Sequence, residues 1–296
     1  MADDTPGLLE RVLALKAIPE LASLHPDDLL ALARVARPSQ WEPGVDPTQQ
    51  ADDAPRVCFL LEGRVRSDPR GRISFHEAPC TLGLVEALAD LRPAPWRADS
   101  VARALVVGRA QLLEVAEDEF ELWRALLRTV CSEALRRGVA RWAPPRGPIP
   151  PGGGDGLVEL ADRIVLLRAA APLREAGVHL LGQIAAEMEM IERNPGELLW
   201  DAGHAARGAL LIVEGAVSSR AAGRAPIRLG PGALLGLPES LSGGSHPERA
   251  VALGRLRALR IDTEALVDVL EDDPTTAEEL LCAIAREVVR ARRTRS

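Results

Sequence analysis

The residues best suited to chemistry stand in two stretches that open alike. GLVEALADLRPAPWRADSV begins at Gly83 and GLPESLSGGSHPERAV begins at Gly236; each reads Gly-Leu-x-Glu-x-Leu and later reaches an Arg-Ala step. The guanidinium groups of Arg97 and Arg249 match phosphate oxygens with two parallel hydrogen bonds. Each stretch is therefore a candidate cradle for a small anion.

The segments that would position these stretches also occur twice. Pro43-Gly44 recurs 152 residues later as Pro195-Gly196, and VCFLLEGRVRS at 57–67 recurs at the same separation as ALLIVEGAVSS at 209–219. Further on, we match Arg97 with Arg249, the segment 112–120 with 258–266, and the closing helix near residue 126 with the one near 280. Because the order of motifs is kept throughout, the sequence indicates a duplicated domain.

Each copy has the same predicted order of elements. A pair of helical segments comes first, short apolar runs separated by Gly and Pro follow, and a long helix closes the copy, at 117–142 and at 263–293 with a break at Asp273-Pro274. Short, evenly spaced strands favour a sandwich or barrel. We expect an α+β fold of two tandem β-roll (jelly-roll-like) domains, 1–142 and 157–296, each flanked by N- and C-terminal helices. A Pro/Gly linker at 143–156 would join them.

This order of motifs resembles the cyclic-nucleotide-binding domain family, which occurs in catabolite-activator-type regulators and in regulatory subunits of cyclic-AMP-dependent kinases. The resemblance covers nearly the whole chain as two tandem copies. It rests on the Pro-Gly turn, the strand ending in Glu-Gly and the LRID run at 259–262. It implies a ligand held against the short helix, with a Glu directly after the Gly accepting a ribose hydroxyl and an Arg further along pairing with the cyclic phosphate.

The chain departs from this pattern directly after each Gly. Leu84 and Leu237 stand where the family has Glu, and leucine accepts no hydrogen bond. Losing a buried charged hydrogen bond costs about 1.5–3 kcal/mol. We therefore expect that both cradles have lost standard ligand binding. The residues of these vestigial or altered cradles are Gly83, Leu84, Glu86, Trp96, Arg97, Ala98, Gly236, Leu237, Glu239, Arg249 and Ala250.

Three alternatives for these side chains stay open at this point. Glu86 and Glu239 could cap the short helix or pair with the nearby Arg and so fill the cradle. In the second copy, Glu248 could take the place of Arg249 and put a carboxylate where a phosphate would bind. Trp96 could pack in the core or stack on a base.

Composition excludes several classes of function. With a net charge of −7 the chain lacks the basic character of a general nucleic-acid binder. No helix-turn-helix follows the closing helix, so DNA is not an expected partner. We find no secretory signal and no apolar run long enough to span a bilayer, and the four cysteines are widely spaced. We expect a cytoplasmic protein that contacts no membrane.

Catalytic patterns are absent from the sequence. The histidines fall in different segments without metal-ligand spacing and are expected at the surface or in loops; they are His25, His76, His179, His204 and His246. SGGS at 242–245 lacks the strand and helix of a nucleophile elbow, and the one lysine excludes a P-loop. A metal-dependent cupin enzyme is the weakest alternative. We expect no enzyme activity, no metal and no cofactor.

The interpretation that combines these points is a non-enzymatic regulatory or scaffold protein that acts through protein–protein contacts. The alternative is a sensor in which Arg97 binds the phosphate of a cyclic or unusual nucleotide. Apolar stripes on the two closing helices, at 126–135 and 280–289, could pack the two copies together as an intramolecular pseudo-dimer. The arginines at 286–295 complement the dipole of a helix end or dock an acidic partner.

Overall fold

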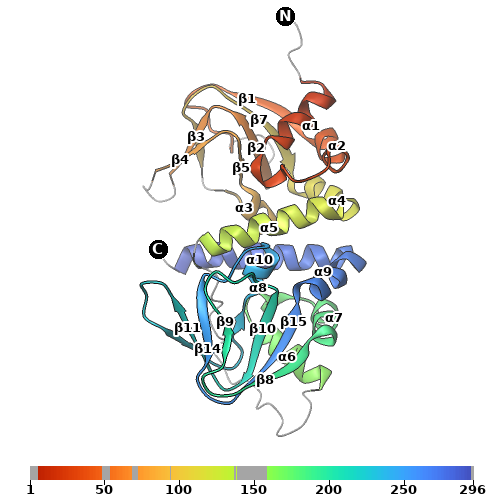
Figure 1. Cartoon of the computed structure of the whole chain (residues 1–296). Coiled ribbons are helices and arrows are strands. Elements are labelled where there is room, and N and C mark those ends of the chain that lie inside the picture. The colour runs from red at the N-terminus through yellow and green to blue at the C-terminus, as the bar shows by residue number, and fades with distance from the viewer. Residues whose placement is uncertain are drawn as a thin grey trace, which may run out of the picture. The chain divides into compact units, whose positions relative to one another are not determined.

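The chain folds into two compact units. The computed structural model describes residues 6–48, 54–68, 73–93, 95–136, 138 and 159–294. Unit 1 comprises residues 1–126 and unit 2 comprises residues 127–296 (Figure 1). The boundary falls inside a helix, whereas the predicted linker at 143–156 lies outside the described residues. None of the helices described has the length and apolar character of a membrane span.

Unit 1 is an antiparallel roll with helices at both ends of its sequence. Its sheets have the strand orders β1-β7-β2-β5 and β4-β3-β6. Its elements are α1 (Leu8–Lys16), a 3₁₀ turn (Pro19–Leu21), α2 (Pro26–Val35), β1 (Arg37–Trp41), β2 (Arg56–Glu62), β3 (Arg64–Ser67), β4 (Ser74–Glu77), β5 (Cys80–Leu82), α3 (Leu84–Leu88), β6 (Trp96–Ala98), β7 (Ala102–Gly108) and α4 (Arg109–Asp118), followed by α5 (Phe120–Arg136), which crosses the boundary.

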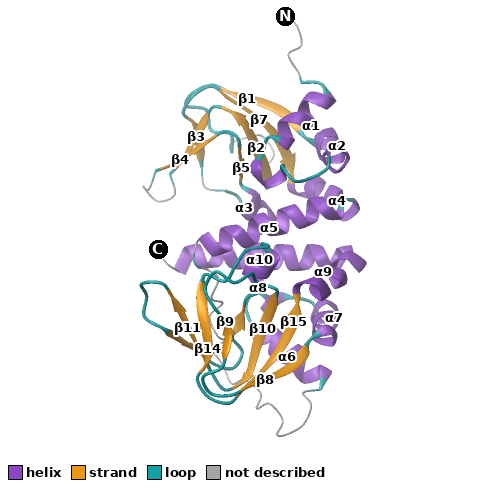
Figure 2. Cartoon of the chain, in the orientation of Figure 1, coloured by secondary structure: helices purple, strands orange, loops and turns teal. Residues whose placement is uncertain are grey.

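Unit 2 repeats this architecture, with the strand orders β13-β10-β15-β8 and β12-β11-β14-β9 (Figure 2). Its elements are α6 (Leu160–Ala169), a 3₁₀ turn (Leu173–Glu175), α7 (Val178–Glu187), β8 (Glu189–Arg193), β9 (Leu198–Trp200), β10 (Gly208–Glu214), β11 (Val217–Ala221), β12 (Ile227–Leu229), β13 (Leu234–Leu235), α8 (Leu237–Leu241), β14 (Glu248–Ala252), β15 (Leu256–Asp262), α9 (Thr263–Asp272) and α10 (Pro274–Thr294). The predicted α+β fold with two β-roll domains is confirmed.

The duplication extends to individual contacts in the first part of each copy. The guanidinium of Arg11 donates to the carbonyl oxygen of Ala33 at 3.2 Å, and that of Arg163 donates to the carbonyl oxygen of Ala185 at 3.1 Å. Both contacts tie the first helix of the unit to the end of the second. Each residue of the second pair lies 152 positions after its counterpart, so the separation found in the sequence is the structural one.

In the second part of each copy the separation grows to 154 residues. The N–H of Gly44 donates to the carbonyl of Ala98 at 2.8 Å, and the N–H of Gly196 donates to the carbonyl of Ala252 at 2.8 Å. Ala98 and Ala252 are therefore equivalent, and β15 is the counterpart of β7. The match of 112–120 with 258–266 is wrong, because residues 112–118 lie in α4. The match of the closing helices near residues 126 and 280 has the correct separation.

The closing helices of the two copies agree with the prediction in unit 2 and differ from it in unit 1. The second copy breaks between α9 and α10 at Asp273, as expected before Pro274. The first copy has the same break at Glu119, between α4 and α5, although no proline stands there. Proline, the signal that predicts the break in the second copy, is missing here, and the non-helical backbone of Glu119 (φ −118°, ψ 85°) ends α4.

Apolar side chains fill the interior of each roll. In unit 1 the cluster contains Trp41, Cys58, Leu60, Val65, Leu82, Trp96, Ala98, Ala102 and Ala104. In unit 2 it contains Ile212, Val217, Leu229, Ala233, Leu235, Ala250, Ala252 and Leu256, with Leu199 and Trp200 packed against it. The stretches predicted to form the cradles thus contribute residues to a packed core.

The glycine of the second Glu-Gly turn is required by a close approach of the backbone. Gly215 has φ +85°, and a Cβ there would lie 2.4 Å from the carbonyl oxygen of Arg255. Gly196 has nearly the same φ, +81°, but its Cβ would meet open space. We expect Gly196→Ala to destabilise unit 2 by about 1–2 kcal/mol, the penalty of a left-handed non-glycine residue, and Gly215→Ala by more than about 3 kcal/mol.

The two glycine variants can be compared by urea denaturation, with alkylation of the buried thiol of Cys282 as the reporter of unit 2. Cys282 lies on α10 and is 4% exposed, so it reacts when the unit unfolds. Equal losses for Gly196→Ala and Gly215→Ala would contradict the role given to the contact with Arg255.

Candidate functional site

The two short helices begin as the sequence predicts. Gly83 (φ 75°) caps α3 and Gly236 (φ 81°) caps α8, both in the left-handed conformation that glycine tolerates best. Leu84 and Leu237 follow directly and are 5% and 4% exposed. The position at which the family resemblance calls for a sugar-binding Glu is therefore occupied by a buried apolar side chain in each unit.

The structure does not bring Arg97 and Arg249 to the cradles. Both side chains are exposed, whereas Ala98 and Ala250, the next residue in each strand, are buried in the roll. Alternate residues of a strand face opposite sides of a sheet, so each arginine lies on the outer face. The strand register shows further that the two Arg-Ala steps are not equivalent: at a separation of 154 residues, Arg97 corresponds to Val251.

In unit 1 the cradle is filled by Trp96. Its side chain is 8% exposed and belongs to the apolar cluster of the roll. The ring atom Cη2 lies 2.8 Å from the point that a Cβ on Gly83 would occupy, so the indole packs directly on the residue that starts α3. Of the two roles considered for Trp96, the structure shows the packing one. Glu86, on α3, is half-buried.

In unit 2 the corresponding region contains buried polar residues. Glu239 on α8 and Glu248 on β14 are 3% and 8% exposed. The hydroxyl of Ser219 donates to the carboxylate of Glu248. The ring of His246 stacks on Trp200 with centroids 4.1 Å apart and planes 12° from parallel. Of the open alternatives, it is thus Glu248 and not Arg249 that faces inward.

Two polar atoms in this group have no hydrogen-bond partner among the described residues. They are Oε2 of Glu239 and Nε1 of Trp200, and both are buried. The pKa of Glu239 rises to about 7, chiefly because burial disfavours its charged form and also because Glu248 is near, although its own backbone N–H opposes the shift.

Burial shifts the pKa of the neighbouring histidine in the opposite direction, downward. It lowers the pKa of His246 to about 4, with a further contribution from His204, while Glu248 opposes the shift. At neutral pH His246 is therefore uncharged, so it supplies no positive charge to balance an anionic ligand beside the buried carboxyl groups of Glu239 and Glu248.

His246, Trp200 and Ser219 belong to this group but are not among the site residues predicted from the sequence. His246 lies in a loop, as expected of the histidines, but it is 5% exposed. Over the part of the chain that is described, no three His, Cys, Asp or Glu side chains come together as a metal site.

Comparison with known proteins gives one family and a set of similar structures. Residues 190–273 match the family model of the cyclic nucleotide-binding domain. No curated protein matches the chain.

Three solved structures illustrate the similarity. The regulatory domain of Toxoplasma gondii PKA in complex with cAMP is 14% identical over 98% of this chain and 96% of its own, with a TM-score of 0.35. A cyclic nucleotide-binding-like protein from Brucella abortus is 26% identical over 37% of this chain and 98% of its own, with a TM-score of 0.34. The N-terminal domain of a transcriptional regulator from Streptomyces coelicolor is 23% identical over 44% and 94%, with a TM-score of 0.39.

The family match lies within unit 2 and includes α8, Glu239 and Glu248. The resemblance seen in the sequence is therefore confirmed: residues 190–273 match the cyclic nucleotide-binding domain family, and unit 1 repeats the same order of helices and strands.

Proposed function

We propose that this chain is a non-enzymatic regulatory or scaffold protein whose two cyclic-nucleotide-binding-like domains have lost standard ligand binding and act through contacts with other proteins. The observation that carries the proposal is that the chain's own side chains occupy both cradles. Trp96 packs on Gly83 in unit 1, and the carboxyl groups of Glu239 and Glu248 are buried beside α8 in unit 2.

The side chains that occupy the two cradles disfavour the binding of a cyclic nucleotide for different physical reasons. The indole of Trp96 takes up the volume next to the start of α3, so a ligand there would have to displace a core side chain. In unit 2 a phosphate would approach the carboxyl groups of Glu239 and Glu248 in a buried site, where its own charge would lose its hydration and any ionised carboxylate beside it would repel it. The sensor alternative needs Arg97 at the phosphate, but Arg97 is exposed on the other face of β6.

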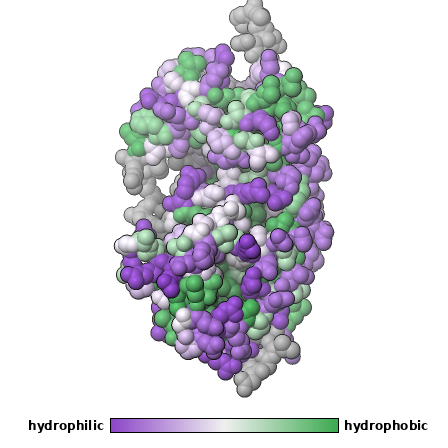
Figure 3. Space-filling view, in the orientation of Figure 1, coloured by the Kyte–Doolittle hydropathy of each residue, from purple (hydrophilic) through white to green (hydrophobic). Residues whose placement is uncertain are grey.

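The outer face of the second sheet of unit 2 offers a surface for a protein contact. In the strand register, Arg220 on β11 lies directly opposite Arg249 on β14. Arg228 on β12 lies opposite Ser218, which is on the same face of β11 as Arg220. All three arginines are exposed, and Figure 3 shows hydrophilic residues gathered over β11. Like charges directly opposite each other destabilise a sheet. An acidic segment of a partner protein would relieve this repulsion.

Calorimetric titration of the full chain with cyclic AMP, cyclic GMP and cyclic dinucleotides tests the loss of ligand binding. We expect no saturable heat up to a ligand concentration on the order of 500 μM. This concentration is well above the dissociation constant of a pocket that is specific for its ligand. Arg97→Ala and Arg249→Ala serve as matched variants, because both arginines are exposed and their removal leaves the packed cradles intact.

Saturable binding that disappears in Arg97→Ala would replace the proposal with the sensor alternative. Binding that persists in both variants but disappears in His246→Ala would place a working site in unit 2 and would equally contradict the loss of binding.

A further inference from the structure

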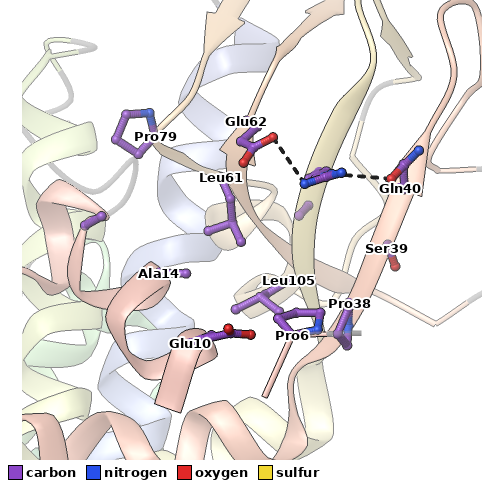
Figure 4. Close-up of a pocket in the computed structure, with 13 residues that line it drawn as sticks. Pro6, Glu10, Ala14, Pro38, Ser39, Gln40, Leu61, Glu62, Pro79 and Leu105 are labelled. Carbon is purple, nitrogen blue, oxygen red and sulfur yellow. Dashed lines mark hydrogen bonds and ion pairs between the residues drawn. The ribbon is translucent and has the colours of Figure 1, made fainter. Parts of the chain in front are cut away.

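Unit 1 has a groove outside its roll, between α1 and the β1, β7 and β2 strands. Its volume is about 730 Å³, within the range of small-molecule sites. In Figure 4 the side chains of Leu61, Leu105 and Ala14 line the middle of the groove, while Glu10 and Glu62 lie toward opposite ends. The groove thus has an apolar middle and charged ends, and it lies apart from Trp96 and Gly83.

The duplicated unit has larger side chains at two positions that correspond to residues lining this groove. At the separation of 152 residues, Ala14 of α1 corresponds to Leu166 of α6, and Ser39 of β1 corresponds to Ile191 of β8. Leu166 is 2% exposed, so its side chain is packed where unit 1 has a methyl group. The fold does not require the groove; it follows from small residues at these two positions of unit 1.

An arginine at this groove also differs between the units. Arg103 donates to the amide oxygen of Gln40 at 3.4 Å and lies 3.8 Å from the carboxylate of Glu62, and its side chain is 51% exposed. The counterpart Arg257 is 11% exposed and pairs with two carboxylates, that of Glu214 at 3.1 Å and that of Glu192 at 3.7 Å. Since Glu192 corresponds to Gln40, unit 1 has a neutral amide where unit 2 has a second carboxylate.

We propose that this groove binds a small monocarboxylate with an apolar body. The ligand's carboxylate pairs with the guanidinium of Arg103, in the role that Glu192 has in unit 2, and the apolar body lies along Leu61 and Ala14. Arginine presents five N–H donors, so it can bind the ligand and keep its contact with Glu62. A single charge fits best, because Glu10 and Glu62 would repel a polyanion.

Titration of the full chain with octanoate, at concentrations below micelle formation, tests the proposal. We expect saturable binding that weakens at least tenfold in Ala14→Leu/Ser39→Ile, which carries the side chains that unit 2 accommodates at the same positions. Arg103→Gln should weaken binding by a similar factor, because the carboxylate loses its charged partner. Gln40→Glu should also weaken binding, since it restores the second carboxylate of unit 2 beside the arginine.

Arg260→Gln provides the matched control. Arg260 is a half-exposed arginine of unit 2 paired with Asp262, and its loss should leave octanoate binding unchanged. Alkylation of the buried thiol of Cys58 checks that each unit 1 variant is folded. No binding of octanoate at millimolar concentration, or binding that Ala14→Leu/Ser39→Ile leaves intact, would overturn the site. Equal binding of 1-octanol, with Arg103→Gln having no effect, would overturn the carboxylate assignment.

Discussion

Replacing Glu239 by glutamine should stabilise unit 2 at pH 8 by about 3 kcal/mol and change its stability little at pH 4. The pKa of Glu239 is raised from 4.5 to about 7, chiefly by burial. Below pH 4.5 the carboxyl group is protonated in both the folded and the unfolded chain, and its ionisation does not affect folding. As pH rises toward 7, the unfolded chain loses this proton first, and stability falls by about 1.4 kcal/mol per unit of pKa difference.

His246 should make the stability of unit 2 depend on pH in the opposite direction, over nearly the same pH range. Its pKa is lowered from 6.5 to about 4, chiefly by burial. Above pH 6.5 it is neutral in both states, and as pH falls toward 4 the unfolded chain binds a proton that the folded chain does not. The stability of unit 2 therefore falls by up to about 3 kcal/mol on acidification. In the wild-type chain the two slopes nearly cancel between pH 4.5 and 6.5.

Single variants should reveal each slope separately. In Glu239→Gln, the stability of unit 2 should rise with pH between 4 and 6.5, because His246 acts alone. In His246→Phe, which keeps an aromatic ring against Trp200, stability should fall between pH 4.5 and 7. Urea denaturation with alkylation of Cys282 measures both, with each variant compared with wild type at the same pH. Parallel profiles for wild type and Glu239→Gln would contradict the buried, uncharged carboxyl group.

Most of the fold could be predicted from the sequence because the first part of each copy is duplicated without a gap. Pro43-Gly44 and the Glu-Gly turns fix the separation of 152 residues, and contacts such as those of Arg11 and Arg163 preserve it. Local chemistry also determined the short helices: a glycine in the left-handed conformation starts each one.

The candidate site was harder to predict because the copies differ in length around it. The separation grows from 152 to 153 residues at Gly83 and Gly236 and to 154 at Ala98 and Ala252. Arg97 and Arg249 were matched only because the dipeptide Arg-Ala happens to occur in both stretches. The alternation of strand residues was the available signal: an apolar Trp96 and Ala98 on either side of Arg97 predict that the arginine faces outward. No comparable pattern in the sequence indicates that His246 is buried, because this burial depends on the stacking of its ring on Trp200, a residue 46 positions away.

Trp96→Ala should destabilise unit 1 by about 3–5 kcal/mol, the usual loss for removing a buried tryptophan. The indole packs within the apolar cluster of the roll and against Gly83, so its removal leaves a cavity lined by apolar side chains. Such a cavity stays dry and binds apolar molecules of matching shape. Added indole should therefore raise the urea midpoint of the variant, measured by alkylation of Cys58, and leave that of the wild-type chain unchanged.

Leu112→Ala is the matched control, since Leu112 is fully buried on α4 and its loss should cost about 2–5 kcal/mol. An isobutyl group is smaller than an indole, so the space left in this variant matches indole less well, and indole should raise its midpoint less than that of Trp96→Ala. This comparison separates a filled cradle from ordinary core packing. If Trp96→Ala lost less than about 1 kcal/mol, or if indole raised both midpoints alike, Trp96 would not be the side chain that occupies the cradle. The cradle of unit 1 would then be open to a ligand, and the proposed loss of nucleotide binding would have to rest on Leu84 alone.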